Sequence, residues 1–391
     1  MHRMGKEEIQ AVTKVIASQQ FMRYRGGENG CVVHFEKDLC EKIGVKHALT
    51  VNSGTSALIC AMVGLGLGPG DEVIVPAFTW VATALAPLGA GAVPVLAEVD
   101  ETLMIDPADI ERKITKYTKA IIPVHMSNLV CNMDAIMRIA RKHNLLVCED
   151  ACQAVGLTYK GRRVGSIGHA NAFSFNQFKN ITSGEGGASL TNDDRVFERM
   201  RIYHDTGAYT RASTCKVKVP FFAGQNYRAT EIMGAMLGVQ LGRLDGILRG
   251  LRERRAVLAE ILSKSKRFKL SPHNDPANAA ALTIQFASEP EARAFSKEQP
   301  GRVSVAVDSG RHVYPNWLPL MNQGTFHPKM NPYAWAKRKI AYTADMCPRT
   351  LAILGRTCTV PFAYNLPMAE VRALGKQLLD CSGTTGRFAQ T

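Results

Sequence analysis

A chain of 391 residues is long enough to form a sizeable core and two domains. A hydrophobic fraction of 46% and a charged fraction of 21% are typical of a globular protein and leave little room for disorder. No apolar run approaches the roughly 20 residues that cross a bilayer, and the N-terminal residues lack the apolar stretch of a secretory signal. We therefore expect a cytoplasmic protein without a membrane partner.

The net charge of +14 is compatible with nucleic acid or with small anionic molecules as partners. The basic residues from Arg243 to Arg255 alternate with leucines at helical spacing, which favours the solvated face of a packed helix. No RNA-binding or zinc-finger signature is visible, so nucleic acid is not expected. The ten cysteines form no CxxC pair and the ten histidines show no metal-ligand spacing. We expect buried free thiols and no metal site.

In chain order, helices alternate with short apolar strands. Helices are predicted over about 5–20 and 33–43, from the small-residue turn 52–58 to about Leu65, from 78–80 onward, and over 107–114 and 133–143. Strands are predicted over 48–51, 72–76, 93–96, 120–124 and 145–148. Such alternation predicts an α/β fold with a mainly parallel sheet covered on both faces. In such sheets, ligands bind beyond the carboxyl ends of the strands.

Small residues follow the first strand, in the sequence Asn52-Ser53-Gly54-Thr55. A strand, a small-residue turn and a helix form the arrangement in which free backbone N–H groups and the helix dipole hold a phosphate. N-capping of the helix by Ser53 or Thr55 is the simpler explanation, and these residues alone favour it.

Two further side chains lie at predicted strand ends. Asp150 follows the apolar strand 145–148, where a carboxylate is costly unless it meets a cation or hydrogen-bond donors. It either caps the next helix or pairs with the protonated ring nitrogen of a cofactor. Trp80 occupies an equivalent position, where its flat side chain either stacks on a ring or belongs to the core.

A polar hairpin connects two more predicted strands, over 172–175 and 188–191. It contains one cation, Lys179, and then Gly184-Glu185-Gly186-Gly187. A lysine that faces inward loses solvation, and its neutral amine becomes a nucleophile able to form a Schiff base. A solvated surface lysine is the equally weighted alternative from this stretch alone.

A helix is predicted over 193–203, and a long helix over about 230–262 connects to a second domain. We divide the chain into a large domain, 1–245, which includes the N-terminal helices, and a small domain, 246–391. The small domain contains a Pro-, Asn- and His-rich stretch around His312 and Trp317, a composition typical of specificity loops. The arginines and His312 of this region are candidates for binding a carboxylate.

A phosphate-holding turn, a stacking aromatic, a carboxylate and a lysine together suit pyridoxal 5′-phosphate. This cofactor needs an amine to bond its aldehyde and an acid to keep its pyridine nitrogen protonated, which makes the ring an electron sink. The same lysine, once released, can move a proton between the substrate Cα and the cofactor.

Six ordered motifs resemble those of the DegT/DnrJ/EryC1/StrS family of fold-type I, pyridoxal-phosphate-dependent sugar aminotransferases. The motifs are VNSGTSAL (51–58), GPGDEVIVPAFTWVAT (68–83), KAIIPVHM (119–126), EDACQAVG (149–156), FSFNQFKNITSGEGG (173–187) and GQNYRATEIMGA (224–235). The resemblance implies a large domain with a mostly parallel seven-stranded sheet and a smaller C-terminal α/β domain.

The resemblance also implies roles for individual residues. Lys179 would be the Schiff-base lysine and Asp150 the partner of the pyridine nitrogen. The other implied cofactor contacts are Ser53, Gly54, Thr55 and Ser174 around the phosphate, Trp80 on the ring, Gln153 near the phenolic oxygen, and Asn226 reaching the cofactor of a neighbouring subunit. The last contact implies a homodimer with shared active sites. The candidate substrate contacts are His125, His312 and Tyr314.

The expected reaction is ping-pong transfer of an amino group from glutamate or glutamine to a keto or aldehyde sugar or cyclitol. One branch of the family carries histidine in place of the lysine and performs dehydration, whereas Lys179 favours amino transfer. The C-terminal pattern, HVYPNW (312–317), HPKMNP (327–332) and MCPRT (346–350), is most similar to 8-amino-3,8-dideoxy-octulosonate aminotransferases, and scyllo-inosose aminotransferases share PVHM. The segment 127–134, SNLVCNMD, departs from the family because it lacks the glycine that usually follows PVH.

Two alternatives stay open. The first is a pyridoxal-phosphate enzyme of the same fold that performs elimination or C–C bond formation on a non-sugar substrate. The second is a cofactor-binding regulatory protein without turnover, which the net charge of +14 faintly supports.

Overall fold

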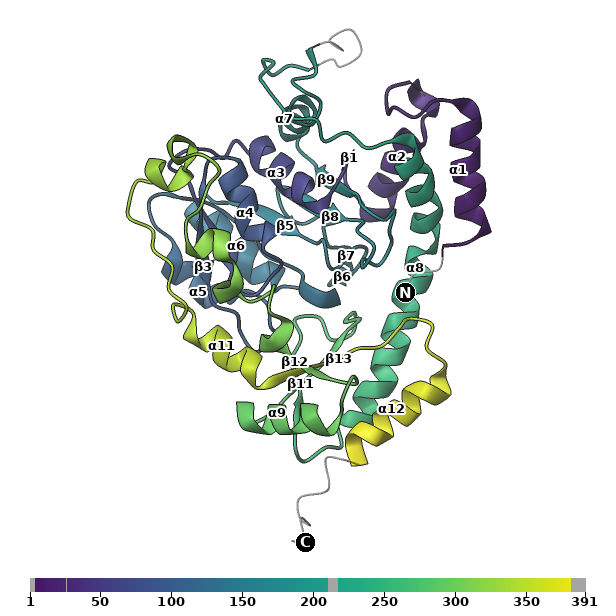
Figure 1. Cartoon of the computed structure of the whole chain (residues 1–391), viewed down its shortest axis with the longest axis vertical. Coiled ribbons are helices and arrows are strands. Elements are labelled where there is room, and N and C mark those ends of the chain that lie inside the picture. The colour runs from purple at the N-terminus through teal and green to yellow at the C-terminus, as the bar shows by residue number, and fades with distance from the viewer. Residues whose placement is uncertain (1–3, 26, 210–216, 381–391) are drawn as a thin grey trace.

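The computed structural model describes residues 4–25, 27–209 and 217–380 (Figure 1). The helices are α1 (Lys6–Ser18), α2 (Cys31–Ile43), α3 (Gly54–Gly64), α4 (Ala82–Gly89), α5 (Pro107–Lys113), α6 (Met133–His143), α7 (Asp194–His204), α8 (Glu231–Leu262), α9 (Glu289–Glu298), α10 (Leu318–Met321), α11 (Pro348–Gly355) and α12 (Met368–Asp380). The strands are β1 (His47–Val51), β2 (Glu72–Pro76), β3 (Val93–Ala97), β4 (Thr118–Ile121), β5 (Leu146–Asp150), β6 (Thr158–Tyr159), β7 (Arg162–Arg163), β8 (Ala170–Ser174), β9 (Gly187–Thr191), β10 (Lys269–Leu270), β11 (Leu282–Gln285), β12 (Ser304–Val305) and β13 (Thr357–Val360).

Seven strands form the main sheet, in the order β1-β9-β8-β5-β4-β2-β3. The neighbours from β8 to β3 pair in parallel, and β9 runs antiparallel to both β8 and β1. Strands β2, β3, β8 and β9 are buried along their whole length, as expected for strands of a sheet that is covered on both faces. The prediction of an α/β fold with a mostly parallel seven-stranded sheet is confirmed.

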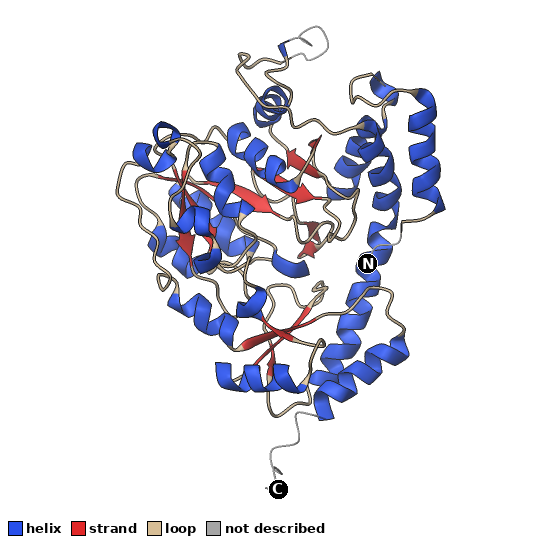
Figure 2. Ribbon diagram, in the orientation of Figure 1, coloured by secondary structure: helices blue, strands red, loops and turns tan. Residues whose placement is uncertain are grey.

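A second sheet lies at the lower end of the molecule in Figure 2. Its order is β10-β11-β13-β12, and every pair in it is antiparallel. Helix α8 runs beside both sheets (Figure 1). Residues Leu237 to Leu251 on α8 pack in the core of the main sheet, whereas Leu258 and Leu262 pack with the second sheet. This single helix therefore joins two hydrophobic cores.

The chain returns to the main sheet after β12. Tyr314, Trp317 and Leu320 are buried in the first core. Arg338 binds the buried carboxylate of Glu72 on β2 through two hydrogen bonds of 2.6 and 3.1 Å. The middle part of the range 246–391 therefore packs on the main sheet. The division at 245/246 stays a prediction.

The observed ends of one helix and one strand differ slightly from the predicted ends, and these differences determine where two site residues lie. Helix α4 begins at Ala82, so Thr79 and Trp80 lie in the turn between β2 and the helix. Strand β5 extends to Asp150, so its carboxylate belongs to the last residue of the strand.

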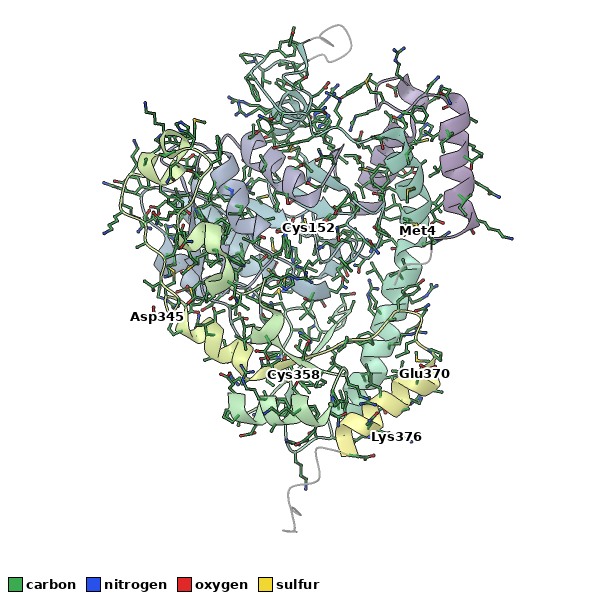
Figure 3. The ribbon with its side chains drawn as sticks, in the orientation of Figure 1. Met4, Cys152, Asp345, Cys358, Glu370 and Lys376 are labelled. Atoms are coloured by element: carbon green, nitrogen blue, oxygen red, sulfur yellow. The ribbon has the colours of Figure 1, made fainter. Side chains whose placement is uncertain are left out.

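The described cysteines are free thiols and are buried or half-buried; Cys215 and Cys381 lie outside the described residues. Figure 3 labels Cys152 beside the main sheet and Cys358 on β13. Of the helices that the structure describes, none combines the length and apolar character that crossing a bilayer requires.

Candidate active site

A cavity of about 490 Å³ opens at the carboxyl ends of the parallel strands. The ends of β1, β2, β5 and β8 meet at this edge because these strands point in the same direction. The cavity is lined by most of the site residues predicted from the sequence, namely Ser53, Gly54, Thr55, Trp80, Asp150, Gln153, Ser174, Lys179 and His312. Segments far apart in the chain are thus brought together around one space.

The N-terminus of α3 forms one wall of the cavity. Ser53 is the N-cap, and its hydroxyl accepts a hydrogen bond of 3.1 Å from the backbone N–H of Ser56. The N–H groups of Gly54 and Thr55 precede the first intrahelical bonds and have no partner within the helix. A Cβ on Gly54 would lie 2.7 Å from the Cβ of Ser174. Capping by Ser53 therefore leaves N–H groups at the helix end unused, and the glycine lets this end approach the hydroxyl of Ser174.

Asp150 lies deep in the cavity and is 4% exposed. Its carboxylate accepts hydrogen bonds from the hydroxyl of Thr83, at 2.7 Å, and from the backbone N–H of Cys152, at 3.1 Å. Thr83 is held in turn by the hydroxyl of Thr79, at 2.8 Å. Both donors to Asp150 are neutral, and no cation of the described residues forms an ion pair with it. A buried carboxylate in this situation favours a cationic ligand.

Lys179 lies on the turn of the β8–β9 connection, where its backbone N–H bonds the carbonyl of Asn176 at 2.9 Å. The side chain is half-buried and lines the cavity. Within the described residues, its ammonium group forms no ion pair or hydrogen bond. Its charge acts on Cys152 and on His312, so it lies close to both sides of the cavity. This position corresponds to the inward-facing alternative for Lys179.

Burial and the neighbouring charges set the protonation of two cavity residues. Burial, together with the carboxylate of Asp150, raises the pKa of the Cys152 thiol well above its ordinary value. Burial, followed by the positive charges of Arg311 and Lys179, lowers the pKa of His312 to about 4. At neutral pH, Cys152 is therefore a thiol and His312 a neutral imidazole.

The opposite wall of the cavity is formed by two chain segments, one around Thr79 and one around His312, that are joined by backbone hydrogen bonds. The carbonyl of His312 accepts a hydrogen bond from the backbone N–H of Thr79, at 2.9 Å, and Tyr314 N–H bonds the carbonyl of Ala77, at 3.1 Å. The His312 ring lies 5.7 Å from the Trp80 ring, and the guanidinium of Arg311 lies 5.6 Å above the same ring. Sequence reasoning named the arginines of this region together and did not single out Arg311.

Two predicted substrate contacts do not reach the cavity. His125 is fully buried, and both of its ring nitrogens are used, by Glu149 at 3.1 Å and by the backbone N–H of Cys131 at 3.1 Å. Tyr314 is also fully buried, and its hydroxyl donates to the carbonyl of Ala344 at 2.6 Å. The packed interior thus takes up the polar atoms of both side chains, and their contact with substrate stays a prediction.

Asn226 lies outside the cavity and is exposed. Its backbone forms an antiparallel bridge with Asp205, and its side chain accepts a bond of 3.4 Å from the N–H of Arg228. Its predicted contact with a neighbouring subunit stays a prediction.

The segment that departs from the family pattern lines the cavity. Ser127 and Asn128 have φ values of 51° and 61°, in the left-handed region that glycine adopts most easily. Gln153 accepts a hydrogen bond of 3.3 Å from the N–H of Ser127, and Asn180 donates one of 2.7 Å to the side chain of Asn128. The absent glycine was the only signal in the sequence that this turn is unusual.

Comparison with known proteins agrees with this geometry. The sequence pattern of the DegT/DnrJ/EryC1/StrS aminotransferase family matches residues 2–378. The chain is 46% identical over 215 residues to the GDP-perosamine synthase of Caulobacter vibrioides, covering 55% of this chain and 57% of that protein. It is 46% identical over 200 residues to the spore coat polysaccharide biosynthesis protein SpsC of Bacillus subtilis, covering 51% of this chain and 50% of that protein. The chain thus spans about half the length of these curated relatives.

Solved structures match over nearly the whole chain. The crystal structure of 3-amino-5-hydroxybenzoic acid synthase is 27% identical, covers 97% of both chains and has a TM-score of 0.78. The structure of S. venezuelae DesV in complex with a ketimine intermediate is 28% identical, covers 97% of this chain and 95% of its own, and also has a TM-score of 0.78. With the family pattern matched from residue 2 to residue 378, the chain belongs to the DegT/DnrJ/EryC1/StrS aminotransferase family.

Proposed function

We propose that this protein is a pyridoxal-phosphate-dependent aminotransferase that moves an amino group from glutamate or glutamine to a keto or aldehyde sugar or cyclitol. The observation that carries the proposal is the meeting of Lys179, Asp150 and the N-terminus of α3 in one cavity. An amine, a buried acid and an anion-binding helix end are the three groups that this cofactor requires.

The residues present fit the cofactor. A Cβ at position 54 would fill the space between α3 and Ser174, so the glycine leaves a cradle for a phosphate. In this cradle, the N–H groups of Gly54 and Thr55 and the hydroxyl of Ser174 would hold the phosphate. Asp150, which accepts hydrogen bonds only from neutral donors, would face the ring nitrogen. Trp80 would lie against the ring.

When bound, pyridoxal phosphate supplies an electron sink for the negative charge that develops at the amino acid Cα. The carboxylate of Asp150 would keep a proton on the ring nitrogen, and Thr83 would orient that carboxylate. The amine of Lys179 would first bond the cofactor and then, released by the substrate amine, take the proton from Cα and return it to the cofactor carbon. Repetition of these steps in reverse on the acceptor gives a ping-pong reaction.

The names of the relatives support a sugar-like acceptor. GDP-perosamine synthase and a spore coat polysaccharide biosynthesis protein are both 46% identical over the matched part. Lys179, the residue that would carry the proton, is present in this chain, which favours amino transfer over the dehydration of the branch that carries histidine.

We also propose a homodimer with shared active sites. Support comes from exposed apolar side chains, because Phe178 at the cavity is 84% exposed and Phe221, five positions before Asn226 in the sequence, is 44% exposed. Exposed aromatic residues beside a site suit cover by a second copy. Mixing the Lys179→Ala and Asn226→Ala variants should restore up to about a quarter of wild-type activity, since half of the dimers would then hold one intact site. Mixed subunits that stay inactive would refute the shared site.

The first test is an absorbance titration of the cofactor-loaded protein with glutamate and, separately, with glutamine. Loss of the band of the lysine-bound cofactor and growth of the pyridoxamine band would identify the donor. Borohydride reduction followed by peptide mass spectrometry should locate the cofactor on Lys179. Reduction on another lysine, or an absorbance band that persists in Lys179→Ala, would refute the assignment.

A further inference from the structure

A hollow of about 350 Å³ lies between helix α6 and the β6–β7 hairpin, and it shares no lining residue with the candidate active site. Three of its lining residues are arginines, Arg138 and Arg141 from α6 and Arg162 from β7. The other lining residues are Met133, Asp134, Met137 and Ile167. A hollow that gathers three guanidinium groups is a positively charged site, and such a site attracts anions.

Most of the hydrogen-bond donors of the three arginines are unused. Within the described residues, the guanidinium groups of Arg138 and Arg141 donate no hydrogen bond and form no ion pair. Arg162 donates one hydrogen bond of 3.1 Å to the carbonyl of Ser166, which leaves most of its five N–H groups for a ligand. All three arginines are exposed, so their side chains are free to turn toward a ligand in the hollow.

The carboxylate that lines the hollow does not neutralise these arginines. Asp134 accepts a hydrogen bond of 2.5 Å from the ammonium group of Lys160, in the turn between β6 and β7. This bond lowers the pKa of Asp134 below its ordinary value, so the carboxylate is ionised and already paired at neutral pH. Since Lys160 balances the charge of Asp134, the charges of the three arginines stay uncompensated.

Two other surface hollows differ from this one because their cations have carboxylate partners. In the hollow between α5 and α6, the ammonium group of Lys142 binds Glu111. In the hollow between α1 and α8, Arg243 binds Glu7 at 2.9 Å and Glu8 at 2.7 Å. The unpaired arginines therefore set the hollow beside the β6–β7 hairpin apart from both.

The stability of α6 does not explain the cluster. Arg141 lies in the last turn of this helix, where a cation interacts favourably with the helix dipole. Arg138 lies three residues earlier on the same side, where two like charges repel each other. Arg162 belongs to a separate hairpin and adds a third positive charge. A bound anion would offset this repulsion.

We propose that this hollow is a binding site for a diphosphate group. A guanidinium donates two parallel N–H bonds to a phosphate, and three guanidinium groups suit the charge and the many oxygens of two linked phosphates. A volume of about 350 Å³ is at the lower end of the range for small-molecule sites. The diphosphate is either free pyrophosphate or part of an organic ester, for which Met133, Met137 and Ile167 offer apolar contacts. The site lies beyond the proposed aminotransferase function and does not depend on it.

Calorimetric titration of the cofactor-loaded protein tests the site. The probes are pyrophosphate, adenosine diphosphate, adenosine and inorganic phosphate, with EDTA present and the ionic strength held constant. The loaded cofactor keeps these probes out of the proposed phosphate site at α3. The variants are Arg138→Met, Arg141→Met and Arg162→Met, singly and combined. Arg372→Met is the matched control, since Arg372 is also exposed and helical but lies on α12, outside the hollow.

The wild type should bind pyrophosphate more tightly than inorganic phosphate, because two linked phosphates reach more of the guanidinium groups. The dissociation constant of pyrophosphate should rise about tenfold or more in each single variant of the hollow, because a charge-assisted bond is lost. It should stay unchanged in Arg372→Met, and adenosine should not bind. Tighter binding of adenosine diphosphate than of pyrophosphate identifies an ester as the ligand, and the reverse order identifies free pyrophosphate.

The proposal is overturned if the wild type binds pyrophosphate no better than inorganic phosphate, or if the triple variant keeps the wild-type affinity. An equal loss in Arg372→Met also overturns it, because the effect would then come from overall charge. The midpoint of urea unfolding confirms that each variant is folded. A wild type that binds pyrophosphate but does not convert glutamate or glutamine contradicts the proposed function and leaves the diphosphate site intact.

Discussion

Glu149 and Asp150 are neighbours on β5, yet their carboxylates meet opposite surroundings. Glu149 is fully buried and accepts hydrogen bonds from His125, at 3.1 Å, and from three backbone N–H groups of the loop before β8, at 2.6 to 2.9 Å. Asp150 accepts two bonds from neutral donors and borders the cavity. Successive residues of a strand face opposite sides of the sheet, which separates the two environments.

The comparison shows how one strand end serves both structure and chemistry. Burial by itself would raise the pKa of Glu149, but the bonds from His125 and from the backbone outweigh it and hold the pKa below its ordinary value of 4.5. All of the hydrogen-bonding capacity of this carboxylate is used inside the protein. Asp150 retains capacity for a ligand, so the acid with fewer internal partners is the one that we assign to the reaction.

Replacing Asp150 by asparagine should give the largest change in activity. The amide keeps the size of the side chain but cannot stabilise a protonated ring nitrogen, so turnover should fall by about 10²- to 10³-fold. The midpoint of urea unfolding of the cofactor-free protein should change little. Wild-type turnover with glutamate in this variant would falsify the proposed partnership with the ring nitrogen.

Replacing Glu149 by glutamine should instead act on stability. The amide nitrogen would face N–H donors that now bond a carboxylate oxygen, and breaking a buried network of this kind costs about 3 kcal/mol. Urea unfolding of wild type and variant, at an unchanged m-value, measures the difference.

The sign of the pH dependence is a further check on Glu149. Because its folded pKa lies below 4.5, its stabilising contribution is present above pH 4.5 and is lost as the pH falls through the folded value. The difference between wild type and the Glu149→Gln variant should therefore shrink in acid. A difference that is small at pH 7 would contradict the structural role.

Replacing Gly54 by alanine tests the proposed phosphate site at the N-terminus of α3. The new Cβ would lie 2.7 Å from the Cβ of Ser174, and such overpacking costs about 1 to 3 kcal/mol. Cofactor affinity, measured by equilibrium dialysis, should fall. The matched control is Gly68→Ala, where a Cβ would meet nothing within 4 Å and affinity should stay unchanged.

The smallest expected effect is a shift in the titration of His312. Its pKa is lowered to about 4 by burial and then by Arg311 and Lys179, so Arg311→Met should move the pKa upward, toward the ordinary value of 6.5. Wild type should lose stability as the pH falls from 6.5 toward 4, because the unfolded chain binds a proton there and folded His312 does not. NMR titration of the histidine ring protons measures the shift, and an unchanged pKa would place Arg311 too far away to act on the cavity.

The same comparison explains why two predicted substrate residues, His125 and Tyr314, lie buried outside the cavity. His125 precedes the predicted loop at a strand end, a position from which a side chain often reaches a ligand. Its ring turns toward Glu149 on the packed side instead. Nothing in the local sequence tells whether the ring points toward the cavity or toward the packed interior, because the direction depends on its partners at residues 149 and 131.

The sequence by itself determined the α/β alternation and the main sheet, because apolar runs and small-residue turns are local patterns. It also indicated candidate cofactor residues at the strand ends. Only the tertiary structure decided which polar side chains face the cavity and which are used up inside. It also brought Arg311 over Trp80, residues more than two hundred positions apart in the chain. The physical reason is that the charge balance of a cavity depends on hydrogen bonds between distant segments, and no local pattern records them.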